Sequence, residues 1–256
     1  MLFRLLSGEV SQRESARILA VNDKTVARRL DYFKEVAMHL HGEFLNMLKA
    51  EGRLSSTIQF DDMETFEHTK LKPVAIPLLV DGKERFIYGI DAASMPAKGL
   101  LAAISVKKYG KRDDDRAEAW LNVLSMSKPF IATEGVTITT DMHTLYPKMI
   151  KRVLPGVEHI RKKSRRAAVV GQGELKKGGH DPLFSLNHTA AMLRAHICRL
   201  IRRSWNTTKK IDRLVCHLWL YVLQHNVSIE MKRRQRLLRE RAIPTKSKKN
   251  QKMLTA

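Results

Sequence analysis

The spacing of hydrophobic and polar residues changes twice along the chain. Residues 1–56 repeat apolar side chains at helical spacing, and residues 57–141 contain short β-branched runs bounded by turn residues. Helical spacing returns strongly from about residue 186. This order predicts an all-α segment, then an α/β domain with a sheet, then a helical C-terminal part.

Residues 1–34 show two short helical patterns around a turn at Asn22 and Asp23, with Asp23 as the expected N-cap of the second helix. The apolar positions that would pack the pair are Ala16, Leu19, Val21, Val26 and Leu30. The second helix would direct four polar or basic residues outward: Lys24, Thr25, Arg28 and Arg29. A major groove accepts such a helix, so the segment is typical of a helix-turn-helix head that binds DNA. The alternative is an ordinary amphipathic helix pair.

Three further segments follow this head. Residues 35–56 continue as a helical connector that ends near Gly52. Residues 57–226 hold the strand signals and the most apolar helix, so they form the expected main domain. Residues 227–256 are a basic tail rich in Lys and Arg, whose first part could extend as a helix along DNA.

The strand signals of the main domain follow a definite order. The stretch IQFDD is the first strand, and residues 72–93 predict a hairpin with its turn at 81–83. A helix then follows three aspartates at 113–115, and VTITT is the next strand, ending at Asp141. The order is therefore strand with acid, hairpin, helix, strand with acid. Capping of the helix start is favoured over metal binding as the role of the three aspartates.

The first strand enters an acidic cluster in a very basic chain. The formal net charge is +21, yet residues 58–68 hold four acids: Asp61, Asp62, Glu64 and Glu67. Carboxylates this close repel one another unless a cation compensates them. A basic chain with one acidic site predicts a protein that binds nucleic acid and keeps a divalent metal beside it.

Composition excludes several other classes of protein. Two cysteines, Cys198 and Cys216, make neither a disulfide framework nor a zinc site with four cysteines, which favours reduced thiols in a cytosolic protein. Apolar runs stay shorter than the ~18 residues that span a bilayer. No phosphate-loop motif closes the Gly-rich stretch 171–184, and His217 and His225 are expected to pack or hydrogen-bond rather than bind metal.

Three motifs carry a resemblance to a known family. They are FDDMETFEHTKLKP around Asp61, TDMHTLYP around Asp141, and the stretch of residues 171–210 that begins GQGELKKGGHDPLFSLNHTAAMLRAH. The chain resembles a DDE-type insertion-sequence transposase, from the group around the smallest bacterial insertion sequences. The resemblance covers most of residues 57–226. It implies an α/β fold with an RNase H-like catalytic core, a mixed sheet flanked by helices, preceded by the all-α helix-turn-helix head.

The resemblance implies metal-dependent cleavage of the element's DNA ends and transfer of the freed 3′ ends to target DNA. Asp61 would bridge the metal, Mg²⁺ or Mn²⁺, and Asp141 would be the second ligand. Asn187 stands where the family's helix carries Glu, so it is favoured as the third catalytic and metal-binding residue. Glu174, in the Gly-rich loop, is the alternative. Asp62 should point to the opposite face of the strand from Asp61.

The resemblance also implies partners and a location. DNA is the expected partner, both element ends and target, with a homo-oligomer assembled on it and no membrane. The protein would be cytoplasmic, bacterial or archaeal, and associated with the nucleoid. Phosphate contacts are expected from the basic run 161–166 and from four arginines of the C-terminal part: Arg194, Arg199, Arg202 and Arg203.

Two other functions remain open at this stage. Asn187 carries no charge, so the chain could be a catalytically inactive repressor that binds terminal repeats. The third hypothesis is an RNase H-like nuclease that does not carry out strand transfer. The head argues against it, because a general nuclease does not need a sequence-reading module.

Overall fold

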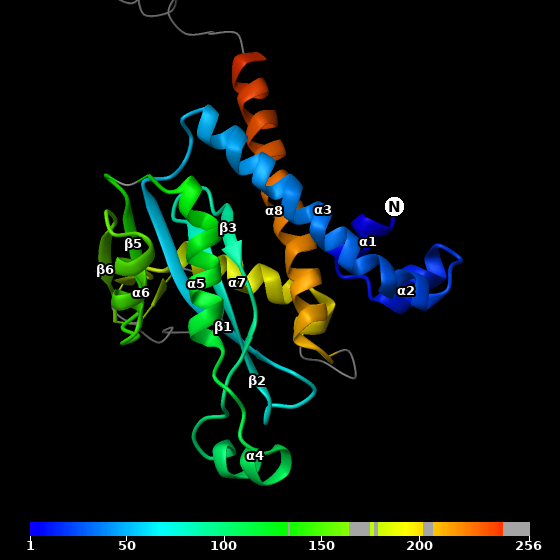
Figure 1. The fold of residues 1–256 in the computed structure, drawn as a ribbon. Coiled ribbons are helices and arrows are strands. Elements are labelled where there is room, and N and C mark those ends of the chain that lie inside the picture. The colour runs from blue at the N-terminus through cyan, green and yellow to red at the C-terminus, as the bar shows by residue number, and fades with distance from the viewer. Residues whose placement is uncertain (133, 164–174, 177–178, 202–206, 243–256) are drawn as a thin grey trace, which may run out of the picture.

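A mixed sheet with helices on both faces forms the centre of the molecule (Figure 1). The computed structural model describes residues 1–132, 134–163, 175–176, 179–201 and 207–242. The sheet has six strands in the order β3-β2-β1-β5-β6, and β4 pairs with β2 beside this row. The expected α/β class with a mixed sheet flanked by helices is confirmed.

The strands of this sheet are β1 Thr57–Phe66, β2 Pro73–Asp81, β3 Ile87–Ile90, β4 Ala93–Ser94, β5 Thr137–Thr140 and β6 Glu158–Arg161. A separate two-residue pair joins β7 Leu175–Lys176 to β8 Gly179–His180. The α-helices are α1 Leu2–Ser7, α2 Gln12–Ile18, α3 Asp23–Ala50, α4 Leu101–Tyr109, α5 Arg116–Ser127, α6 Tyr146–Val153, α7 Phe184–His196 and α8 Ile211–Ala242. Two 3₁₀ turns, Lys128–Phe130 and Cys198–Leu200, follow α5 and α7.

Strand β1 is the point at which the sheet changes direction. It pairs antiparallel with β2 and parallel with β5. The predicted hairpin is present as well, since β2 pairs antiparallel with β3. The last β1–β5 pair joins Phe60 to Thr140, so Asp61 and Asp141 are the next residues on two neighbouring strands. Because β5 ends there, β1 continues alone on that side toward Phe66.

Two apolar layers hold the helices against the sheet. One layer joins Phe60 and Ile138 to α5, α6 and the C-terminal half of α3. The other joins Met63 and Ile76 to α7 and α8. Figure 1 shows α5 and α7 on opposite sides of the sheet. Alternation along the strands explains this division, since successive side chains point to opposite faces.

Helix α5 approaches the sheet closely at Gly89. A Cβ at this position would lie 2.6 Å from the Ser127 hydroxyl and 3.1 Å from the Val123 backbone oxygen. Any side chain there would displace α5, so the glycine sets the spacing between β3 and the helix.

Helices α2 and α3 lie where the sequence predicted two helices around a turn, with one correction to the cap. Ser11 caps α2 by accepting a hydrogen bond from the amide of Glu14. Asn22, not Asp23, is the N-cap of α3, and its side chain accepts from the Lys24 amide at 2.9 Å. Asn fits because its carbonyl oxygen reaches the free amides of the first turn from an extended backbone.

Two long helices cross the domain boundaries that the sequence predicted. The boundary at 34/35 lies inside α3, and the boundary at 226/227 lies inside α8. The helix-turn-helix also shares its core with α8, because Val26 and Leu30 pack with Cys216 and Leu220. Head, connector and main domain are therefore joined by continuous packing.

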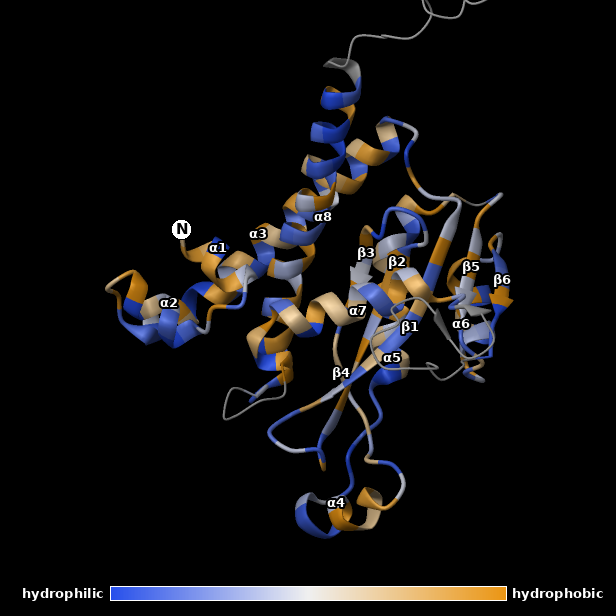
Figure 2. Cartoon of the chain, turned by 180° about the vertical axis from the view of Figure 1, so that it is seen from behind, coloured by the Kyte–Doolittle hydropathy of each residue, from blue (hydrophilic) through white to orange (hydrophobic). Residues whose placement is uncertain are grey.

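The segment between β4 and α5 differs from expectation in two ways. Residues 101–109 form α4, which stands away from the sheet (Figures 1 and 2) and exposes apolar side chains such as Ile104. Asp115 is the N-cap of α5 but makes no side-chain cap bond. Asp114 instead binds the Arg116 side chain at 2.6 and 2.7 Å, with only a 3.4 Å contact to its amide. The expected capping is thus largely replaced by an ion pair.

Asn226 of α8 closes the outer edge of the sheet. Its side chain accepts from the Ile87 amide and donates to the Ile87 carbonyl, both at 2.9 Å, in place of another strand. The residue is fully buried and also lies 3.4 Å from the ring of His41.

We expect Asn226→Ala to destabilise the fold by about 2–4 kcal/mol, because it leaves two buried backbone groups without partners. Urea unfolding followed by circular dichroism measures this change. The matched control is Gln224→Ala, an exposed position two residues earlier on α8, which should change stability by less than about 0.5 kcal/mol. Equal effects at the two positions would contradict the role given to Asn226.

Candidate functional site

Asp61 and Asp141 meet at the end of β5. They are the next residues after the last parallel pair, Phe60 and Thr140, so the register places them on neighbouring strands. Burial first, and then the negative charge of Asp141, raises the pKa of Asp61 to about 6. The two residues stand 80 positions apart in the chain. The arrangement that the sequence predicted for them is present.

Each of these two carboxylates has a local hydrogen-bond donor. The Tyr146 hydroxyl donates to Asp61 Oδ1 at 3.3 Å, and the Asp62 amide donates to the same oxygen at 2.7 Å. Asp141 Oδ1 accepts from the His143 amide at 2.8 Å, which fixes the turn after β5. The two side chains are thus held by backbone and phenol donors, with no lysine or arginine among these bonds.

Asp62 is a third carboxylate next to this pair, on the other face of β1. The Trp120 indole donates to Asp62 Oδ1 at 2.7 Å from α5, which puts Asp62 on the α5 face of the sheet. Burial raises the pKa of Asp62 to about 7; the Trp120 bond lowers it, and the Asp61 charge raises it further. Arg116, 5.5 Å from the centre of the Trp120 ring, is the nearest cation that acts on Asp62.

Tyr146 stands where the three aspartates converge. Burial, and then the charges of Asp62, Asp61 and Asp141, raise the pKa of Tyr146, so its hydroxyl keeps its proton and remains a donor. Its ring packs against Trp120 and His143 at 5.0 and 4.9 Å between ring centres. An aromatic wall therefore supports one side of the aspartate group.

Sequence reasoning missed this wall. Trp120 is buried in the core, as an apolar residue of a helix is expected to be, but its indole also binds Asp62. The available signal was TDMHTLYP, which places His143 and Tyr146 two and five residues after Asp141. That spacing did not reveal that the Tyr146 hydroxyl reaches Asp61 of β1, or that the His143 ring packs against Tyr146.

The predicted third ligand makes a different contact. Asn187 is exposed near the start of α7, and its amide donates to Asp181 Oδ2 at 2.7 Å. Among the hydrogen bonds of the described residues, none joins Asn187 to Asp61 or Asp141. Glu174 lies outside the described residues. Within the part of the chain that the structure describes, no group of three His, Cys, Asp or Glu side chains is arranged to hold a metal ion.

The predicted DNA-contacting residues fall into two sets. Lys24, Thr25, Arg28 and Arg29 are all exposed on the first turns of α3. The arginines of the C-terminal part are less accessible. Arg194 is half-buried and donates to the Glu64 carbonyl at 3.2 Å, while burial lowers the pKa of Arg199. Arg202, Arg203 and residues 164–166 of the basic run lie outside the described residues.

Other candidate groups are accounted for by packing. His217 lies 3.0 Å from the Gln12 side chain, and His225 lies 3.0 Å from the Arg85 carbonyl, so both are hydrogen-bonded as expected. Cys198 and Cys216 are free thiols. Among the described residues, no helix is long and apolar enough to cross a membrane.

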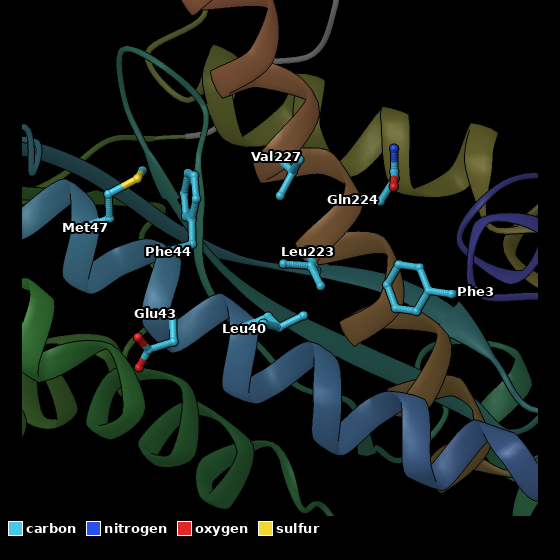
Figure 3. Close-up of a pocket in the computed structure, with 8 residues that line it drawn as sticks. All are labelled: Phe3, Leu40, Glu43, Phe44, Met47, Leu223, Gln224 and Val227. Atoms are coloured by element: carbon cyan, nitrogen blue, oxygen red, sulfur yellow. The ribbon is translucent and has the colours of Figure 1, made fainter. Parts of the chain in front are cut away.

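The hollow in Figure 3 lies between α3 and α8, and Phe3, Phe44 and Leu223 make its walls mainly apolar. Its volume is about 460 Å³, and Glu43 supplies its carboxylate. None of the three aspartates lines this crevice, so it is separate from the aspartate site. An apolar wall with a negative charge also does not suit a phosphate.

The raised pKa values of Asp61 and Asp62 predict how stability depends on pH. A carboxyl group that is harder to ionise in the folded state destabilises the fold once the pH rises above its unfolded value. We therefore expect Asp62→Asn to gain stability relative to wild type as the pH rises from about 4 to about 7, in metal-free buffer.

Urea unfolding at a series of pH values measures this difference. Asp115→Asn is the control, because Asp115 is exposed at the start of α5 and makes no cap bond. A constant difference between wild type and Asp62→Asn across the range would show that Asp62 ionises normally.

A scan of the sequence against protein-family models finds no match, and a search among curated proteins finds no relative.

Proposed function

We propose that the chain is a metal-dependent DNA transposase of the DDE type, with an RNase H-like core. The observation that carries the proposal is the convergence of Asp61 and Asp141 at the end of two parallel neighbouring strands. This matches the arrangement that the resemblance implies, an acid on the first strand and a second acid at the end of the fourth. Among the strands of the main row, β5 is the fourth along the chain.

The aspartate site suits a divalent cation in charge and in ligand type. Mg²⁺ prefers hard oxygen ligands and is commonly held by one or two carboxylates together with waters and substrate phosphates. Asp61 and Asp141 supply two carboxylates, and their repulsion is the charge imbalance that a cation relieves. When bound, such an ion polarises the phosphate and lowers the pKa of an attacking water or hydroxyl.

The protein's own side chains would keep this site in position. Tyr146 holds Asp61 through its hydroxyl, and the His143 amide holds Asp141. Trp120 holds Asp62 on the opposite side of β1 from Asp61. The Asp62 carboxylate adds negative charge there, but it is not part of the turn that holds Asp141. The exposed basic start of α3 would read the element ends, which puts recognition and chemistry on two separate surfaces.

A second candidate is a repressor that binds the terminal repeats without cutting them. The observation that favours it is the placement of Asn187, which bonds Asp181 through its amide nitrogen and, among the described residues, makes no hydrogen bond to Asp61 or Asp141. The two functions differ in one measurable property, namely cleavage of bound DNA.

We expect the protein to nick a duplex that carries the DNA flanking its gene, in the presence of Mg²⁺ or Mn²⁺. Asp61→Asn and Asp141→Asn should each lower the cleavage rate by at least about 100-fold, since losing a ligand exceeds the usual 10–100-fold cost of losing a ligand's supporting partner. Binding of the same duplex should persist. Gel analysis of end-labelled DNA measures cleavage, with Asp115→Asn as the matched control.

The outcomes separate the candidates. Binding without cleavage by wild type in either metal favours the repressor, and cleavage that survives in both aspartate variants rejects the assigned site. An independent readout is thermal unfolding: Mg²⁺ should raise the Tm of wild type and not that of Asp61→Asn, because only the folded wild-type site binds the ion.

A further inference from the structure

Arg85 is the centre of a groove between the β2–β3 turn, α7 and α8. Three hollows, of about 350, 740 and 450 Å³, all include Arg85 in their walls. The first begins at Gln59 of β1, and the last reaches Arg236 in the outer half of α8. The three hollows adjoin one another at Arg85; the first and third also share Lys83, and the second and third share Lys232. We call the three together the groove.

The walls of this groove are strongly cationic. Six basic side chains line it: Arg4, Lys83, Arg85, Lys232, Arg233 and Arg236. Two acids line it, and Asp181 is already engaged by the Leu183 amide and by Asn187, which leaves Glu84. Within the described residues, Arg4, Lys83 and Lys232 make no ion pair. The groove therefore carries uncompensated positive charge.

The turn that presents Arg85 is held in an unusual conformation. Arg85 has φ of 65°, a left-handed backbone that costs a non-glycine residue of order 1 kcal/mol. The Asp81 carboxylate fixes the turn by accepting from the Lys83 and Glu84 amides, and His225 bonds the Arg85 carbonyl. Three contacts thus maintain one strained position, which is a reason to look for a role of its side chain.

The Arg85 guanidinium has no carboxylate partner in the described part of the chain. Its Nη1 atom lies 3.4 Å from both ring nitrogens of His188. Burial and the Arg85 charge lower the pKa of His188, so the imidazole is neutral at pH 7 and does not compensate the arginine. A half-buried arginine without a counter-charge is a site that lacks an anion.

One end of the groove lies near the aspartate site along β1, although Asp61 and Asp141 are not among the residues of its walls. Gln59 bonds the Leu186 amide of α7, so it lies on the α7 face of β1. Asp61 follows two residues later, which places it on the same side of the strand and roughly 7 Å further along. On α8, Lys232, Arg233 and Arg236 are spaced to project from one side of the helix.

We propose that this groove binds the phosphodiester backbone of a nucleic acid and guides it to Asp61 and Asp141. Arg85 takes one phosphate, and Lys232 takes another further from the site. A row of cations along three linked hollows suits a chain of phosphates better than a single small anion. This inference rests on the proposed function for its direction, but binding itself can be tested without cleavage.

The test is the salt dependence of DNA binding in metal-free buffer, by fluorescence anisotropy of a labelled oligonucleotide. Each lost phosphate contact should reduce the slope of log K against log salt by about 0.9 on duplex DNA or about 0.7 on a single strand. We expect Arg85→Gln and Lys232→Gln each to show one such decrease. Binding should weaken about eightfold per contact on duplex at 0.1 M salt.

Arg152→Gln is the matched control, because Arg152 is an exposed arginine of α6 outside the groove. Arg85→Lys should retain most of the slope, since it keeps the charge. Lys232 is exposed, so its variant tests the groove even if Arg85→Gln alters the turn. Parallel titrations with duplex and single-stranded DNA show which form the groove accepts.

Slopes for Arg85→Gln and Lys232→Gln equal to that of Arg152→Gln on both forms of DNA would overturn the proposal. The result is separable from the proposed function. A reduced slope in a protein that never cleaves DNA keeps the groove and rejects the transposase. Cleavage that depends on Asp61, together with unchanged slopes for both groove variants, keeps the transposase and rejects the groove.

Discussion

The repulsion between Asp61 and Asp141 is the interaction on which the candidate chemistry depends. It exists because β1 and β5 run parallel and because β5 ends one residue before Asp141. A parallel neighbour places equivalent positions of two strands beside each other, even when about 80 residues separate them. The sheet therefore places negative charges that repel one another at one point. Hydrogen-bond donors from Tyr146, Trp120 and backbone amides surround that point.

The long helices give this site a rigid setting. Helix α8 contacts the sheet edge through Asn226 and the helix-turn-helix through Cys216 and Leu220. An ion-pair network around Glu230 joins α8 to Arg53 just after α3. Recognition by α3 and chemistry at β1 would thus occur in parts of one packed structure. Under the proposed function, DNA held by the head would have a fixed orientation relative to the aspartates.

The cationic groove and the aspartate site are complementary in charge. Acids gather at the end of β5, and unpaired cations gather around Arg85 on the α7 side of the same central strand. A phosphate chain lying along the groove would be attracted by the cations and would approach carboxylates that repel it unless a divalent ion is present. Under the proposed function, a bound metal ion would therefore favour binding of the phosphate chain, and the bound phosphate chain would favour binding of the metal ion.

Some features followed from the sequence alone. The α/β class, the hairpin at β2–β3, the helix-turn-helix and the order of the two acid-bearing strands are local patterns, set by side-chain period and turn residues. What the tertiary structure decided is which distant groups meet. Trp120 and Tyr146 reach the aspartates, and within the part of the chain that the structure describes Arg85 stands without a carboxylate. None of these contacts has a local signature, because packing of helices on the sheet, and not the spacing of residues in the chain, brings these side chains together.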